Sequence, residues 1–178
     1  LFSDGLDAFG VLFLEDGNIQ DKKKNMIIRS AKSGMMFIDP RHYYEQTFRT
    51  INEMIAHECF HWYRHQPYHL LMKMLGVRDN LGRVICCAVD SGDSDAEQWG
   101  SYEWMEWQAN SMVPYILMPE KTATRKIEEM LREYHISFDD SESGSQMEEL
   151  ISELAEFYGL SKQAAKTRMS ELGFLMAE

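Results

Sequence analysis

The stretch from His57 to His69 reads HECFHWYRHQPYH and contains four of the six histidines in the chain. They stand at every fourth position, at His57, His61, His65 and His69. A four-residue period places side chains along one stripe of an α-helix. The stretch therefore predicts a helix with a histidine stripe, on which two adjacent histidines are close enough to bind one metal ion.

The predicted helix covers about 51–65, and Pro67 predicts its end. Inside a helix the proline ring would clash with the carbonyl group of Tyr63, and it disfavours helical geometry at the preceding residue. His65 and His69 then lie at and beyond the helix end, where the helix dipole favours an exposed, protonated imidazole. We expect no metal-binding role for these two histidines.

Two histidines four residues apart can bind one Zn²⁺ ion from the same helix face, at about 2.0–2.1 Å each. His57 and His65 cannot share an ion on a straight helix, because eight residues separate them by about 12 Å along its axis. The pairs His57/His61 and His61/His65 are equivalent in geometry. Only in the first pair does a glutamate, Glu58, follow the leading histidine directly.

The resulting HExxH order over 57–61 indicates hydrolytic chemistry. Zinc lowers the pKa of a bound water to about 7, and a carboxylate beside that water can take its proton and later pass it to a leaving amine. Glu58 is therefore the predicted acid and base, with His57 and His61 as metal ligands. In the alternative interpretation, the histidines are only the surface of an amphipathic helix.

A hydrolytic zinc site also needs a third protein ligand and one open position. The best candidates lie in YEWMEWQAN, residues 102–110, within a helix predicted over 102–118. Glu106 and Asn110 are four residues apart, so the carboxylate could bind zinc while the amide hydrogen-bonds to a ligand histidine. Glu103 could be the ligand instead, and a solvated acidic face is the alternative for both glutamates.

Three of the four tryptophans, Trp99, Trp104 and Trp107, lie close to this segment. Core packing is the expected role for them, and a wall that contacts substrate is the alternative. Cys59 points away from the metal-binding face of its helix, so we expect a small buried hydrophobic residue there.

The composition is that of a globular protein: the 178 residues are 44% hydrophobic and 26% charged, with a net charge of −11. No apolar run reaches the ~18 residues that cross a membrane, and the acidic start LFSDGLDAFG does not resemble a secretory signal. Three cysteines without a CxxC pair indicate neither a disulfide framework nor a thiolate zinc site. We expect a cytoplasmic protein, and the initial Leu1 predicts a fragment or a processed form.

Short apolar runs over 8–14, 26–30 and 35–40 predict an antiparallel meander, and RVICCAV over 83–89 predicts a further strand. Helices are predicted over 120–134 and, beyond an acidic linker, as a pair interrupted at YGLS, where Ser161 caps the second helix. The predicted fold class is α+β.

Three segments together resemble the ImmA/IrrE family of zinc metallopeptidases. They are HECFH (57–61), EWQANSMVPYILMP (106–119), which is similar to the family's ExxAN…LLMP signature, and LAEFYGLSKQAAKTRMSELG (154–173). The resemblance implies zinc ligation by His57, His61 and Glu106, with Glu58 as the catalytic acid and base. It favours Glu106 over Glu103 as the third ligand.

The resemblance also implies a zincin-like core, in which a small antiparallel or mixed sheet packs on the HExxH helix. The implied organisation is a metallopeptidase domain over 1–135, a linker over 136–146 and a helix-turn-helix-like segment over 147–178. Better-known members are cytoplasmic and cut helix-turn-helix repressors, so a protein substrate of this kind and a role as an anti-repressor are expected.

The competing hypothesis is a non-catalytic regulator in which the metal is structural or absent and the C-terminal helices bind DNA or a protein. Lys162, Lys166 and Arg168 could contact phosphates. However, residues 146–178 hold six glutamates against three basic residues, and the chain has no broad basic surface. This charge balance argues against strong DNA binding and favours a protein partner.

Overall fold

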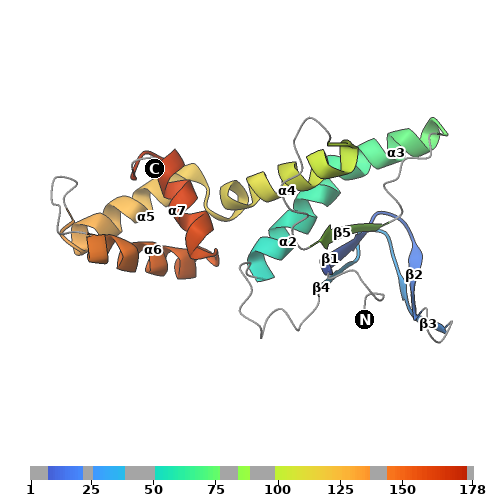
Figure 1. Cartoon of the computed structure of the whole chain (residues 1–178), viewed down its shortest axis with the longest axis horizontal. Helices are drawn as coiled ribbons and strands as arrows, with labels where there is room; N and C mark the ends of the chain where they lie inside the picture. Colours follow the sequence, from blue (N-terminus) through green and yellow to red (C-terminus); the bar gives the residue numbers. More distant parts are fainter. Residues whose placement is uncertain are drawn as a thin grey trace. The chain divides into compact units, whose positions relative to one another are not determined.

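The computed structural model describes residues 8–21, 26–38, 51–76, 84–88, 99–136 and 144–175. The chain has the predicted α+β fold: antiparallel strands come first, and the C-terminal part is helical (Figure 1). Within the described ranges, no helix is both long enough and apolar enough to cross a membrane.

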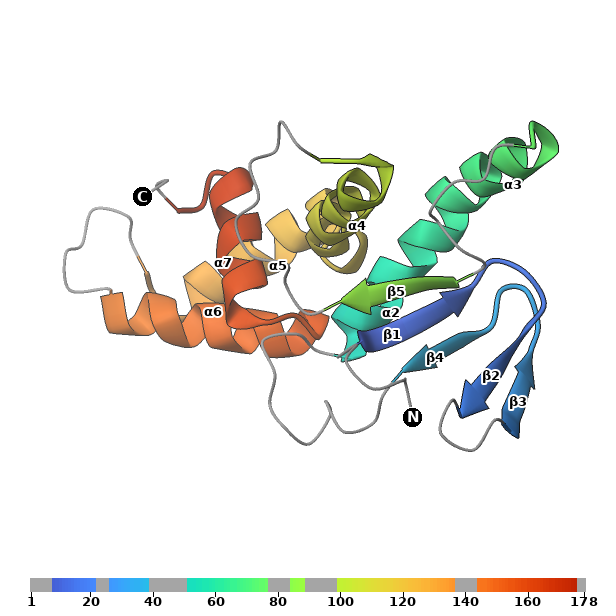
Figure 2. The same ribbon diagram turned by 45° about the vertical axis from the view of Figure 1, so that its right-hand side comes forward.

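Five strands form two small antiparallel sheets. They are β1 (Ala8–Phe13), β2 (Gly17–Asp21), β3 (Met26–Ala31), β4 (Met36–Ile38) and β5 (Val84–Ala88). The first sheet has the order β4-β1-β5, so that Val11 lies opposite both Phe37 and Cys86, and the second sheet consists of β2 and β3 (Figure 2). The expected meander is therefore wrong in its connections. It missed β2, because GNIQD has no apolar run and becomes a strand through its pairing with β3.

The core of the first sheet is built by β1. Its residues Val11, Leu12 and Phe13 are buried, and Tyr102 packs against the cluster of Leu12 and Leu14. In both views α2 (Ile51–Phe60) lies beside this sheet (Figures 1 and 2). The sheet therefore covers the helix that carries the HExxH motif.

The predicted end of this helix at Pro67 is wrong. The helix continues from α2 through a π-helical segment, η1 (His61–His65), into α3 (Gln66–Met74). The amide of Gln66 donates to the carbonyl of His61, five residues earlier. Pro67 then stands in the first turn of α3, where a missing amide proton costs little. The π segment thus lets the helix pass a proline that would break a regular α-helix.

Four helices make up most of the remaining structure: α4 (Ser101–Leu117), α5 (Glu120–Glu133), α6 (Gly144–Tyr158) and α7 (Lys162–Glu171). The predicted break at YGLS is confirmed. Gly159 has a φ of +65°, which favours glycine, and the Ser161 hydroxyl accepts a hydrogen bond from the Ala164 amide at 3.3 Å. Helix α6 begins inside the stretch predicted as a linker, of which 137–143 lie outside the described residues.

The chain divides into two compact units, one formed by 1–47 with 54–112 and the other by 48–53 with 113–178. In the second unit, the Glu53 carboxylate accepts hydrogen bonds from the amide and hydroxyl of Ser161 at 3.0 and 2.9 Å. The HExxH motif and Glu106 both belong to the first unit. The predicted domain boundaries remain a prediction.

Candidate metal centre

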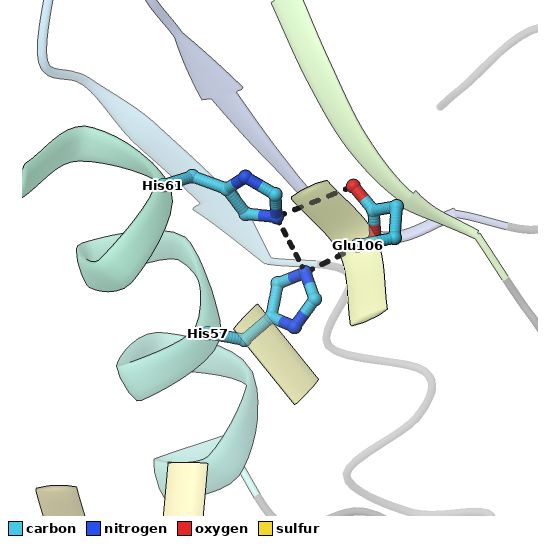
Figure 3. Close-up of side chains that lie close together, drawn as sticks. All are labelled: His57, His61 and Glu106. Carbon is cyan, nitrogen blue, oxygen red and sulfur yellow. Dashed lines mark hydrogen bonds and ion pairs between the residues drawn. The ribbon is translucent and has the colours of Figure 1, made fainter. Parts of the chain in front are cut away.

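His57, His61 and Glu106 converge from two helices of the first unit (Figure 3). The Nε2 atoms of His57 and His61 are 2.9 Å apart. Glu106 on α4 places Oε2 at 3.2 Å from His57 Nε2 and Oε1 at 3.2 Å from His61 Nε2. Both imidazoles are fully buried, whereas the carboxylate is half-buried. Helical geometry aligns the histidines, and only the packing of α4 on α2 brings the carboxylate to them.

These three side chains fit a metal ion. Each offers one ligand atom, and all the ligand atoms lie within 4.8 Å of one another. With bonds of 2.0–2.1 Å, two ligands of a tetrahedral zinc ion are about 3.3 Å apart, close to the contacts of 2.9 and 3.2 Å found between these groups. Two histidines and a glutamate are also a donor set of catalytic zinc sites, which keep the fourth position open.

The charges of these groups suit a cation. Burial holds the pKa of His61 below its usual range, so the imidazole is neutral near pH 7, as a ligand must be. Burial also raises the pKa of Glu106, but the imidazole rings of His57 and His61 against the carboxylate lower it further, to about 2. Glu106 therefore stays ionised and supplies the negative charge of the centre.

Glu58 is the least compensated group in this region. It is fully buried, and neither carboxylate oxygen has a hydrogen-bond partner among the described residues. Burial and the negative charge of Glu106 raise its pKa to about 8. A buried carboxylate without a partner is costly, and a nearby cation would stabilise its ionised form. These unpaired oxygens are a second observation that favours a metal ion here.

Asn110 lies one turn after Glu106 on α4, and its Oδ1 is buried without a hydrogen-bond partner in the described part of the chain. The Nδ1 atom of His57 is buried and unpartnered in the same way. The predicted hydrogen bond between Asn110 and a ligand histidine is thus not among the contacts of this structure. Asn110 Oδ1 could accept such a bond, and His57 Nδ1 could donate one.

Glu103 does not share the position of Glu106. Its side chain is exposed and accepts a hydrogen bond from the Gly100 amide at 2.9 Å, at the start of α4. Of the two glutamates considered as a third ligand, the structure brings only Glu106 to the histidines.

His65 and His69 are not exposed, contrary to prediction: only 4% and 7% of their surfaces are accessible. His65 contacts both His61, at 2.8 Å, and Gln108 on α4, at 3.2 Å. His69 Nε2 lies 3.3 Å from Glu15 Oε1, which also accepts a hydrogen bond from Lys73. The error follows from ending the helix at Pro67. No sequence pattern predicts that Gln108 or Glu15 faces this helix.

Two of the tryptophans are more exposed than predicted, whereas His65 and His69 are more buried. Trp104 and Trp107 are 42% and 50% exposed, so core packing is wrong for both. Their ring centroids are 5.6 Å apart, and Trp99 contacts Trp104 at 4.9 Å. Cys59 is exposed as well, because the helix face opposite the histidines is open to solvent at this point. The aromatic rings thus form an accessible surface along the helix that carries Glu106.

Arg168, considered above as a phosphate contact, is 5% exposed and belongs to the core of the second unit. Its Nε donates to the carbonyl of Met118 at 3.2 Å, and its guanidinium lies over the ring of Tyr115 at 4.1 Å. A side chain held in this way cannot also reach a DNA backbone.

Comparisons with protein-family models, with curated proteins and with solved structures find no match to this chain. The geometry of the site is what remains as evidence. His57, His61 and Glu106 form a candidate metal site, and these three ligands are consistent with a metal-dependent hydrolase.

Proposed function

We propose that this protein is a cytoplasmic, zinc-dependent endopeptidase that hydrolyses a peptide bond in a protein substrate. One observation carries the proposal: two buried imidazoles and an ionised carboxylate converge next to Glu58, a buried carboxylate that has no hydrogen-bond partner among the described residues. Structural zinc sites are closed by four protein ligands, whereas the described part of the chain offers three here, together with the Glu58 carboxylate, which need not be a ligand.

His57, His61 and Glu106 would hold the zinc ion. When bound, zinc makes a water molecule acidic and polarises a carbonyl group. The protein itself would contribute proton transfer. A carboxylate oxygen of Glu58 takes the proton of the attacking water and delivers it to the nitrogen of the leaving amine. The metal ion would stabilise the ionised form of Glu58, which is the form that can take a proton, and burial of the side chain favours holding that proton until the amine leaves.

The substrate that we propose is a helix-turn-helix transcriptional repressor, so that cleavage would switch genes on. The support is the resemblance of HECFH, EWQANSMVPYILMP and the C-terminal segment to the ImmA/IrrE metallopeptidases. The exposed rings of Trp104 and Trp107 stand on the same helix as Glu106, and they suit contacts with apolar side chains of a bound polypeptide.

The test compares the wild type with Glu58→Gln and, as a matched control, Glu103→Gln. Glutamine has nearly the shape of glutamate and leaves the three metal-binding residues intact, so the first variant should keep its zinc. Cleavage of co-expressed repressors, followed by mass spectrometry of the fragments, should fall at least about 100-fold. The control changes an exposed glutamate on the helix of Glu106 and should alter neither zinc content nor cleavage.

Equal cleavage by the wild type and Glu58→Gln would refute the assigned role of Glu58. If the wild type binds zinc, cuts none of the repressors and shifts duplex DNA in a gel at moderate salt, the non-catalytic regulator replaces the peptidase as the better explanation.

A further inference from the structure

His65 connects a proposed metal ligand with a side chain that the HExxH motif does not include. Its Nδ1 lies 2.8 Å from Nδ1 of His61, and its Nε2 lies 3.2 Å from Oε1 of Gln108. His61 and His65 are the first and last residues of η1, and Gln108 is on α4, two residues after Glu106. All three belong to the first unit, and both imidazoles are buried.

The chemistry of the outermost group determines the protons of the whole chain of contacts. An amide oxygen can only accept, so Gln108 Oε1 requires a proton on Nε2 of His65. Neutral imidazole carries a single proton, which leaves a lone pair on His65 Nδ1. That lone pair accepts from His61, whose proton is then on Nδ1. The remaining lone pair of His61 is therefore on Nε2, the atom that faces His57 and Glu106.

We infer that His65 and Gln108 form a hydrogen-bond relay that fixes His61 in the tautomer needed to bind a metal ion through Nε2. In this arrangement they are positioning residues, since neither reaches the ion or a substrate. The inference rests on the proposed metal site, although not on peptide cleavage.

The relay concerns only one of the two histidine ligands. Glu106 Oε1 lies 3.2 Å from the Nε2 atom of His61, the atom that the relay leaves free for a metal ion. His57 differs from His61, because its Nδ1 is buried with no hydrogen-bond partner in the part of the chain that the structure describes. The relay therefore prepares one of the two histidine ligands, and the π segment places His65 against it without ending the helix.

Zinc affinity provides the first test. Zinc ions are titrated into the full chain in competition with a chromophoric chelator. His65→Leu removes the acceptor for His61 Nδ1 and should weaken zinc binding about 10- to 100-fold, the usual effect of losing a partner of a ligand histidine. The matched control is His69→Leu, which removes another buried histidine of the same helix, one that contacts Glu15 and not the relay. It should bind zinc like the wild type.

Two further measurements keep the inference testable if His65→Leu does not fold. Gln108→Leu should weaken zinc binding in the same direction, because His65 is then no longer held in one tautomer. In the metal-free wild type, long-range ¹⁵N–¹H NMR correlations should show His61 protonated on Nδ1 and not on Nε2.

A proton on Nε2 of His61 would overturn the relay, as would wild-type zinc affinity in both folded variants. If the wild type binds zinc but cuts no protein, the proposed peptidase fails while the relay stands. If the wild type binds no zinc, the proposed metal site fails, and the tautomer of His61 alone decides whether the relay exists.

Discussion

Exchanging Glu58 for glutamine should change how the stability of the zinc-free protein depends on pH. Burial, together with the charge of Glu106, raises the pKa of Glu58 from 4.5 to about 8 in the folded protein. When the pKa of a carboxyl group is raised in this way, the folded state favours the neutral form of the group. The stability associated with Glu58 is therefore fully present below pH 4.5 and is lost as the pH rises through 8.

The size of the effect follows from these two pKa values. The free energy of unfolding of the wild type should fall by about 2–3 kcal/mol between pH 5 and pH 7 through this group alone. Glutamine does not titrate, so Glu58→Gln should lack this part of the loss. Glu106, whose pKa is about 2, stays ionised across the whole range in both proteins and does not contribute to the difference.

Urea unfolding of the chelator-treated proteins at pH 5, 6 and 7 measures the effect. The difference in free energy of unfolding between the variant and the wild type should move in favour of the variant as the pH rises. Glu103→Gln serves as the control for loss of an exposed glutamate and should follow the wild type. Parallel pH profiles for the wild type and Glu58→Gln would refute the reasoning that burial and the charge of Glu106 raise the pKa of Glu58.

Zinc at 1,000 times its Kd should stabilise the wild type by about 4 kcal/mol, and Glu106→Gln should abolish the rise in thermal midpoint; an equal rise in the variant would exclude Glu106 as a ligand. Arg168→Leu removes the donor to the Met118 carbonyl and should lower the free energy of unfolding in urea by about 1–3 kcal/mol, whereas an unchanged midpoint would contradict a stabilising role. Gly159→Ala forces a left-handed alanine against the side chain of Asn52 and should cost about 1–2 kcal/mol, part of which Asn52→Ala should restore.

Some features of this protein depend only on local geometry, and these were predictable. Histidines four residues apart share a face of any helix, so His57 and His61 could be paired from the sequence, and Glu58 distinguished them from the next pair. The break at YGLS was equally local, because Gly159 permits a positive φ and Ser161 caps the helix that follows. Spacing alone left Glu103 and Glu106 equivalent, and the resemblance to the ImmA/IrrE family was needed to favour one of them.

Local rules also produced a specific error. Pro67 is incompatible with a regular α-helix, but a π segment ahead of it places the proline in a first turn, where it is tolerated. With the helix continued, His65 and His69 become buried and acquire partners. Proline does disrupt the hydrogen bonds of a regular α-helix. Here the helix continues because the segment before Pro67 has π-helical hydrogen bonds instead.

The sequence by itself thus determined the helical stripe, the motif within it and the α+β class, because each follows from the spacing of residues along one backbone. Only the tertiary structure decided that Glu106 meets the two histidines and that Gln108 reaches His65. It also decided that Glu58 is buried beside them with no hydrogen-bond partner among the described residues. These facts depend on how α4 packs against α2 and η1. A contact between helices that are some 45 residues apart depends on the packing of every element between them, and not on any period in the sequence.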